Sequence, residues 1–175
     1  KVPPVRCESG GIPRHVGEHR GCLTLGDPVD HEEVIVTLVH AAATWFLVGL
    51  IWIIQVVHYP LFARVGEDGF VAYEAAHTRL ISLVVGPAML VEGVATLWLF
   101  FAPPDGLTRT LPLIAGLVLA GVHLSTITLQ VPAHGRLEGG WDPIVADRLV
   151  RTNWIRTIGW TIRGVLALFI VEAVA

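Results

Sequence analysis

The chain has 175 residues, of which 53% are hydrophobic and 15% charged, and its formal net charge is −3. The apolar fraction is too high for an ordinary soluble domain, and the length suits a single domain. The charged residues form no basic stripe typical of nucleic-acid-binding proteins, so we expect no nucleic-acid partner.

Residues 1–33 differ from the rest of the chain, since they are rich in glycine, proline, histidine and charge. They lack an apolar h-region, which argues against a signal peptide. We expect this segment to be a disordered extension, or one that is not part of the native protein, with Val36 as a candidate start. Its cysteines, Cys7 and Cys22, fit no zinc-binding spacing and are expected to be free thiols.

The first two predicted membrane spans cover about residues 34–59 and 68–102. Residues 34–57 contain no Asp, Glu, Lys or Arg, and a helix of that length crosses ~30 Å of hydrocarbon. We expect Pro60 to end the first span, because proline disfavours helical geometry in the residue before it. Pro87 is expected to kink the second span.

The third and fourth spans are predicted over about residues 111–131 and 143–174. Pro132 is expected to end the third span. Asp142 followed by Pro143 is typical of a helix N-terminus, so the pair is expected to start the fourth. Together the apolar runs predict an all-α domain over residues 34–175, an integral membrane antiparallel four-helix bundle.

The arginines predict an orientation for this bundle. In an antiparallel arrangement, the loops that follow the first and third spans lie at one end, which carries Arg64, Arg79, Arg136, Arg148, Arg151 and Arg156. The positive-inside rule puts this end in the cytoplasm and both termini on the other side. We expect a multi-pass protein of the cell membrane, in bacteria the inner membrane, with the lipid bilayer as its partner. Tyr59 is expected in the interfacial aromatic belt.

Polar side chains gather at this same end of all four predicted spans. They are Gln55 and His58 in the first, Glu74 and His77 in the second, Gln130 and His134 in the third, and Asn153, Arg156 and Trp160 in the fourth. Polar groups at membrane depth are costly unless they face the bundle interior and pair with one another. We therefore expect these side chains to line a cavity, although Glu74, near the start of its span, has solvation as an alternative.

Two charged residues lie deeper in the predicted bundle. The rise per residue places Glu92 and Arg163 near the bilayer midplane, and we predict an ion pair between them. A role in fixing the helix register and a role in catalysis are both open. His123 falls near the same depth, and His40 is expected to hydrogen-bond between helices.

The histidines raise the possibility of a bound metal or haem, and the cofactor stays open. Glu74-x-x-His77 is half of a di-iron carboxylate motif, but the second half is missing. His58 and His77, with His134, are candidate ligands of a single transition metal, and the first two are candidate axial ligands of haem. Chemistry without a cofactor is an alternative, in which a histidine deprotonates an acidic phenol and Arg156 or Asn153 stabilises the anion.

Motifs in the last two spans resemble those of the anthrone-oxygenase-like family of small four-helix membrane proteins. Residues 130–137 (Q-V-P-A-H-x-x-L) are similar to the family's Asn-Val-Pro-Leu-Asn-x-x-Leu. Asn153, Arg156 and Thr157 keep the spacing of its Asn-x-x-Arg-Thr, whereas Gln130 and His134 stand where the family has asparagine. The resemblance implies an oxygenase activity with Asn153 and Arg156 at the site.

Three functions therefore compete. The first is a membrane oxidoreductase or oxygenase acting on a lipophilic aromatic or quinone-like molecule. Its catalytic residues would be His58, His77, Glu74, His134, Asn153 and Arg156, and its substrate contacts Gln55, Gln130 and Trp160. The second is a haem- or metal-binding membrane protein that uses His58 and His77. The third is a non-catalytic subunit of a membrane complex or a small transporter, and a homo-oligomer is compatible with each.

Overall fold

The computed structural model describes residues 31–175, and all the regular structure in this range is helical. Four helical rods, covering His31–Phe62, Glu67–Phe101, Thr110–Leu137 and Pro143–Val174, are long and apolar enough to cross a membrane. Helices of the required length and apolar character are therefore present where the four spans were predicted, although the first and third run past the prolines that were expected to end them.

The structure describes only the last residues of the predicted N-terminal extension. Residues 31–33 belong to helix α1 (His31–Ile53), so the expectation of disorder does not hold for these three. The carboxylates of Glu32 and Glu33 lie in the first turn of α1, where negative charge stabilises a helix N-terminus. The rest of the extension, including Cys7 and Cys22, lies outside the described residues.

Two rods contain a widened, π-helical turn. Helix α1 continues through η1 (Ile54–His58) into α2 (Tyr59–Phe62). Helix α4 (Thr110–Ser125) continues in the same way through η2 (Thr126–Gln130) into α5 (Val131–Leu137).

Each widened turn ends two residues before a proline. The N–H groups of Tyr59 and Val131 bond to carbonyls five residues back, and Pro60 and Pro132 follow them. A proline ring clashes with the carbonyl four residues back in a regular α-helix, and a π-turn changes the spacing at that point. The rods therefore continue, and the prediction that these prolines end their spans is wrong.

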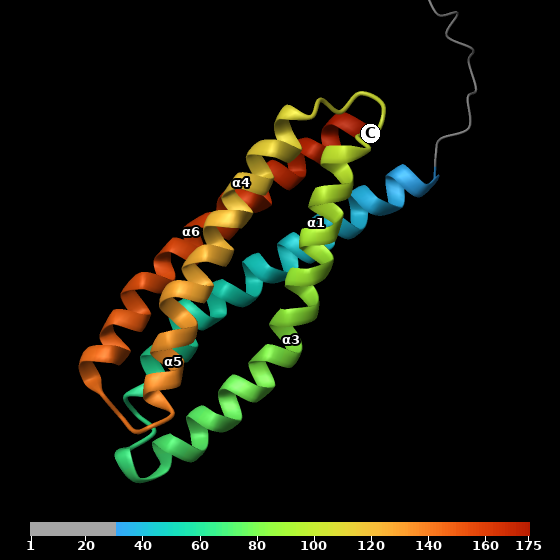
Figure 1. The fold of residues 1–175 in the computed structure, drawn as a ribbon. Coiled ribbons are helices and arrows are strands. Elements are labelled where there is room, and N and C mark those ends of the chain that lie inside the picture. The colour runs from blue at the N-terminus through green and yellow to red at the C-terminus, as the bar shows by residue number, and fades with distance from the viewer. Residues whose placement is uncertain (1–30) are drawn as a thin grey trace, which may run out of the picture.

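The other two rods are single helices. Helix α3 (Glu67–Phe101) runs unbroken through Pro87, and Figure 1 shows that it changes direction along its length. Helix α6 (Pro143–Val174) begins as predicted, because the Asp142 carboxylate accepts hydrogen bonds from the N–H groups of Ile144 and Val145 at 2.8 and 3.2 Å.

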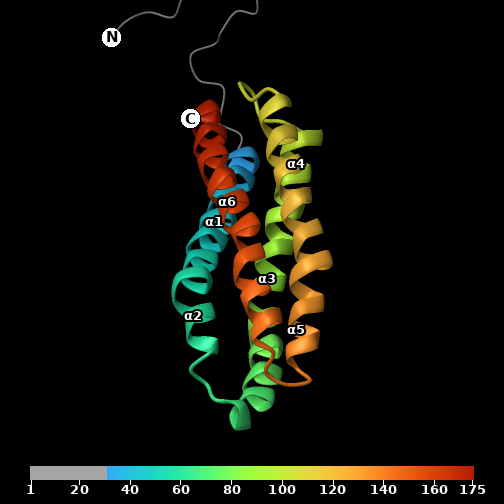
Figure 2. The same cartoon turned by 90° about the vertical axis from the view of Figure 1, so that its left-hand side faces the viewer.

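The four rods surround one core. Helix α1 packs against α3 and α6, and α4 packs against the same two helices (Figures 1 and 2). The loops at residues 63–66 and 138–142 lie at one end of the bundle, which we call the arginine-rich end, while the loop between α3 and α4 and the C-terminus lie at the other (Figure 2).

Polar and apolar side chains are distributed as a membrane requires. Many large apolar side chains face outward, among them Leu83, Leu90, Leu124 and Ile127. The buried polar and charged ones are Thr37, His40, Thr44, Gln55, Glu74, Glu92, Thr96, Ser125, Gln130, Asn153, Arg156, Thr157 and Arg163. Because polar groups are costly in hydrocarbon, this inverted pattern is the one that a lipid environment favours.

Candidate functional site

A cavity of about 430 Å³ lies in the half of the bundle nearer the arginine-rich end. Helix α3 forms one wall, and η2 with α5 forms the other. Its polar lining comes from Tyr59, His77, Thr78, Gln130, His134, Glu138 and Arg156, and its apolar lining includes Ile54, Ile81, Val85, Met89 and Val131. An apolar pocket with a few convergent polar groups is the usual form of a small-molecule site.

His134 is held between a carboxylate and a phenol in the wall of this cavity. Its Nδ1 atom lies 2.5 Å from Glu74 Oε1, and its Nε2 atom lies 3.3 Å from the Tyr59 hydroxyl. An ionised carboxylate only accepts hydrogen bonds, so these partners assign the proton of a neutral His134 to Nδ1. The ring is then oriented with Nε2 as an acceptor, which is the arrangement of a general base.

The local structure explains how these three residues meet. Because the third rod continues past Pro132, His134 lies on helix α5 rather than in a loop. Tyr59 is the first residue of α2 and directly follows η1. Glu74 lies two turns into α3 and is fully buried, so the alternative that it is solvated is wrong.

A second chain of hydrogen bonds runs behind the cavity. Asn153 Nδ2 donates to Gln55 Oε1 at 2.7 Å, and Arg156 Nη1 donates to Asn153 Oδ1 at 3.2 Å. Gln55 comes from the π-turn η1, and Arg156 reaches the cavity lining. The predicted convergence of Gln55, Asn153 and Arg156 is therefore present, but only Arg156 touches the cavity.

Several polar atoms beside the cavity are buried and have no hydrogen-bond partner. Gln130 Nε2 donates to Thr152 Oγ1 at 2.9 Å, while Gln130 Oε1 is unpartnered. Arg156 Nε and Glu74 Oε2 are in the same condition. Buried polar atoms are almost always hydrogen-bonded in folded proteins, so the wall of the cavity holds an acceptor on Gln130 and a donor on Arg156 that lack their usual partners.

The rings of His58 and His77 lie against each other in a tilted arrangement. Their ring centroids are 4.3 Å apart and their planes are inclined by 32°. His77 lines the cavity, whereas the Nε2 atom of His58 is buried and unpartnered. Two rings this close together leave no space for a porphyrin between them, so this geometry does not fit axial ligation of haem.

The same geometry is unsuited to a metal ion. Within residues 31–175, no three His, Cys, Asp or Glu side chains are grouped so as to hold one. The described side chains therefore do not form the shared site that the sequence suggested for His58, His77 and His134. His134 directs Nδ1 to Glu74 and Nε2 to Tyr59, while the rings of the other two residues lie against each other.

Trp160, a predicted substrate contact, does not line the cavity. It lies about one turn deeper than Arg156 and is only 1% exposed. Its indole N–H donates to Glu92 Oε2 at 3.1 Å, and its ring lies 5.3 Å from the Arg156 guanidinium carbon. Trp160 therefore connects the cavity region to a deeper polar network.

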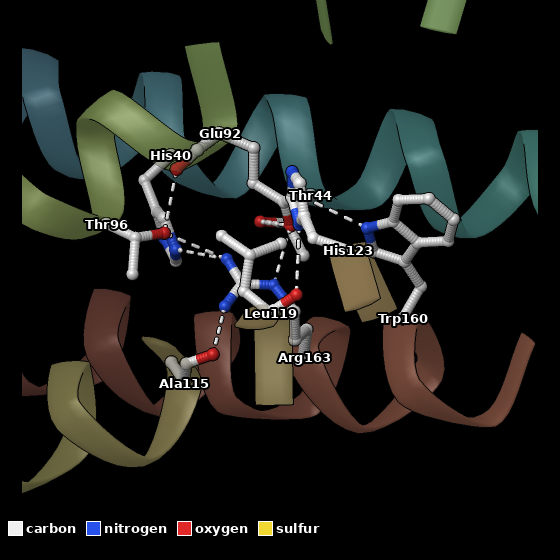
Figure 3. Close-up of polar contacts among 9 residues, drawn as sticks. All are labelled: His40, Thr44, Glu92, Thr96, Ala115, Leu119, His123, Trp160 and Arg163. Carbon is white, nitrogen blue, oxygen red and sulfur yellow. Dashed lines mark hydrogen bonds and ion pairs between the residues drawn. The ribbon is translucent and has the colours of Figure 1, made fainter. Parts of the chain in front are cut away.

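That network contains the predicted ion pair, with Arg163 Nε 2.7 Å from Glu92 Oε1 (Figure 3). Arg163 Nη2 also lies 2.9 Å from Thr96 Oγ1 and 3.3 Å from His40 Nε2. Thr44 donates to Glu92 Oε1 at 3.0 Å, and Arg163 Nη1 donates to the carbonyl of Ala115.

The network joins α1, α3, α4 and α6 and leaves no net charge at its centre, which fits a role in holding the bundle together. His40 hydrogen-bonds between helices as expected. His123 takes no part in the pair, because its Nδ1 atom bonds to the Leu119 carbonyl within α4 at 2.9 Å (Figure 3).

Sequence reasoning missed Tyr59, Thr78 and Glu138 among the polar residues that line the cavity. Tyr59 was expected in the interfacial aromatic belt, and it is 3% exposed and contacts His134. The sequence signal for Tyr59 was the proline that follows it. Pro132 stands in the same place after the π-turn of the third rod, and in both rods the helix continues past the proline toward the cavity. Comparison of the chain with protein-family models, with curated proteins and with solved structures finds no match.

Proposed function

We propose that this protein is a membrane-embedded oxidoreductase of the oxygenase type, acting on a lipophilic aromatic or quinone-like molecule bound in the cavity. The observation that carries the proposal is the Glu74–His134–Tyr59 chain in the cavity wall. It places an oriented imidazole next to the Arg156 guanidinium and to apolar side chains that suit an aromatic ring.

The proposed chemistry begins with removal of a proton. His134 Nε2 accepts the proton of an acidic phenolic substrate through the Tyr59 hydroxyl, which occupies the space in front of it. Glu74 stabilises the imidazolium that forms, and Arg156 stabilises the substrate anion. A ring carbon of the electron-rich anion then forms a C–O bond with dioxygen, and the resulting peroxide takes up the proton held by His134. Cleavage of the O–O bond, with loss of the hydrogen on that carbon, releases water and leaves a quinone, so one dioxygen oxidises one substrate molecule.

The resemblance to the anthrone-oxygenase-like family supports the same function. Asn153 and Arg156, which match the family motif, are hydrogen-bonded to each other beside the cavity. We further propose that the bundle is antiparallel and lies in the cell membrane with the arginine-rich end in the cytoplasm and both termini outside.

The proposal is tested by oxygen consumption of the purified protein against a panel of lipophilic phenols. We expect turnover that His134→Ala abolishes, whereas His123→Ala, at a histidine bonded only within α4, retains it. Turnover that His134→Ala leaves unchanged would overturn the proposal. A visible spectrum and metal analysis of the same sample distinguish this enzyme from a haem- or metal-binding protein.

A further inference from the structure

The cavity wall contains residues that are also exposed on the outside of the bundle. On α3 these are Ser82 and Gly86, and on the α5 side they are Val131 and Gly135. A residue that lines a cavity and is also exposed marks the place where the cavity opens. The cavity therefore opens sideways, between α3 and the start of α5.

The surface around this opening is apolar. On the α3 side Leu83 is 69% exposed, and on the η2 side Ile127 is 66% exposed. Leu90 and Leu124 extend the same exposed surface along the two rods. Side chains of this kind are placed at low cost in hydrocarbon and at high cost in water, so the opening faces lipid.

The side of the opening nearest the arginine-rich end is bridged. Thr78 Oγ1 donates to Glu138 Oε1 at 2.8 Å, which joins α3 to the residue directly after α5. Both residues line the cavity, and Glu138 is exposed. This polar bridge lies between the lipid-facing opening and the loops, so it separates the cavity from the aqueous end.

Two glycines keep the opening wide. A Cβ atom added to Gly86 or to Gly135 would meet nothing within 4 Å. Both have ordinary helical backbones, because the only glycines with positive φ among residues 31–175 are Gly66, Gly106 and Gly140. A larger side chain at Gly86 or Gly135 is therefore accommodated by the backbone and projects into the opening.

We propose that Ser82, Gly86, Val131 and Gly135 frame a lateral portal, through which a lipophilic aromatic molecule dissolved in the bilayer reaches His134 and Arg156. Only the identity of the molecule rests on the proposed function, since the route from the bilayer to the cavity is argued from the cavity lining and the exposed residues around it. The substrate class is thereby narrowed to compounds that partition into the membrane, since the path from water is bridged.

The test uses photolabelling, which needs no turnover. The protein is reconstituted into phosphatidylcholine vesicles with an aromatic diazirine that partitions into the bilayer, and the labelled residues are mapped by mass spectrometry. We expect label on Tyr59 or His134 inside the cavity, and label on the lipid-facing Leu124 serves as the internal standard.

Variants at the portal give the decisive comparison. Gly135→Phe and Gly86→Phe should each lower the cavity label several-fold relative to Leu124, while Gly135→Ala should have little effect. The matched control is Gly121→Phe, at an exposed α4 glycine outside the cavity lining with equally free space around its Cβ.

Cavity label that persists in both portal variants would overturn the portal. Equal labelling of Tyr59 and His134 by a charged, water-soluble diazirine would do the same, because it would show an aqueous route. Failure of the proposed function gives a different result. In that case the cavity is labelled as expected, and the portal variants lower the label, but the protein oxidises no phenol.

Discussion

The behaviour of His134 depends on one buried carboxylate. Among residues 31–175, the side chain that pairs with Glu74 Oε1 is this imidazole, and the second carboxylate oxygen has no hydrogen-bond partner. Sequence spacing placed Glu74, His134 and Arg156 at one depth, because rise per residue is regular. It did not reveal which histidine the carboxylate would contact, since that depends on helix rotation, and here His134 rather than His77 is the partner.

The first prediction concerns this pair. Glu74→Gln removes the charge that stabilises protonated His134 while keeping the size of the side chain. Because positioned acid–base groups contribute about 10²–10⁴-fold to rate, we expect kcat to fall by about that factor with little change in KM. Steady-state kinetics checks this, with Glu67→Gln, at an exposed residue in the first turn of α3, as the control. Equal kcat values in the two variants would contradict it.

The second prediction concerns the ion pair. Both partners are fully buried, so Glu92→Gln leaves Arg163 without a counter-charge in the bundle centre. Removing one member of a buried pair costs about 3–5 kcal/mol, and we expect a loss of that size in the free energy of unfolding, measured by denaturant titration in detergent. The double variant Glu92→Gln, Arg163→Gln should recover part of it. A single variant as stable as the native protein would show that the pair adds nothing to stability.

At the scale of elements, the two π-turns decide which side chains reach the cavity. Each inserts an extra residue before a proline, so the helix beyond it is rotated and still continues. The four spans were predictable because long apolar runs have few alternatives. The π-turns were not predictable from the sequence. A proline indicates that a helix ends, and the same proline is compatible with a widened turn when packing against α6 holds the chain in a helix.

The third prediction follows from η1. Deleting the exposed Val57 removes the extra residue of the turn. The segment then returns to 3.6 residues per turn, where the Pro60 ring clashes with the carbonyl four residues back and bends α2 away. Tyr59 then leaves His134, and we expect turnover to be lost while circular dichroism reports the same helix content. The substitution Val57→Ala keeps the register and should retain activity. An active deletion variant would mean that Tyr59 is not needed.

For the molecule as a whole, the unequal distribution of arginine gives a fourth prediction. If the arginine-rich end is cytoplasmic, a cysteine at Gly139 in the loop after α5 should react with an impermeant thiol reagent only when the cytoplasmic face is accessible. A cysteine at Asp105, in the loop between α3 and α4, should react only from the opposite face. Both are measured in a variant with Cys7 and Cys22 replaced by serine. The reverse pattern would invert the orientation.

Helix α6 carries Asn153, Arg156 and Arg163 on the side that faces the other rods. During biosynthesis, each arginine near the centre of a lone segment adds about 2.5–3.5 kcal/mol to the cost of transfer from the translocon to lipid. The last helix is therefore a poor membrane segment by itself and depends on Gln55 and Glu92, which are synthesised before it, to receive its polar groups. Insertion of the fourth helix is thus coupled to assembly with the first two rods.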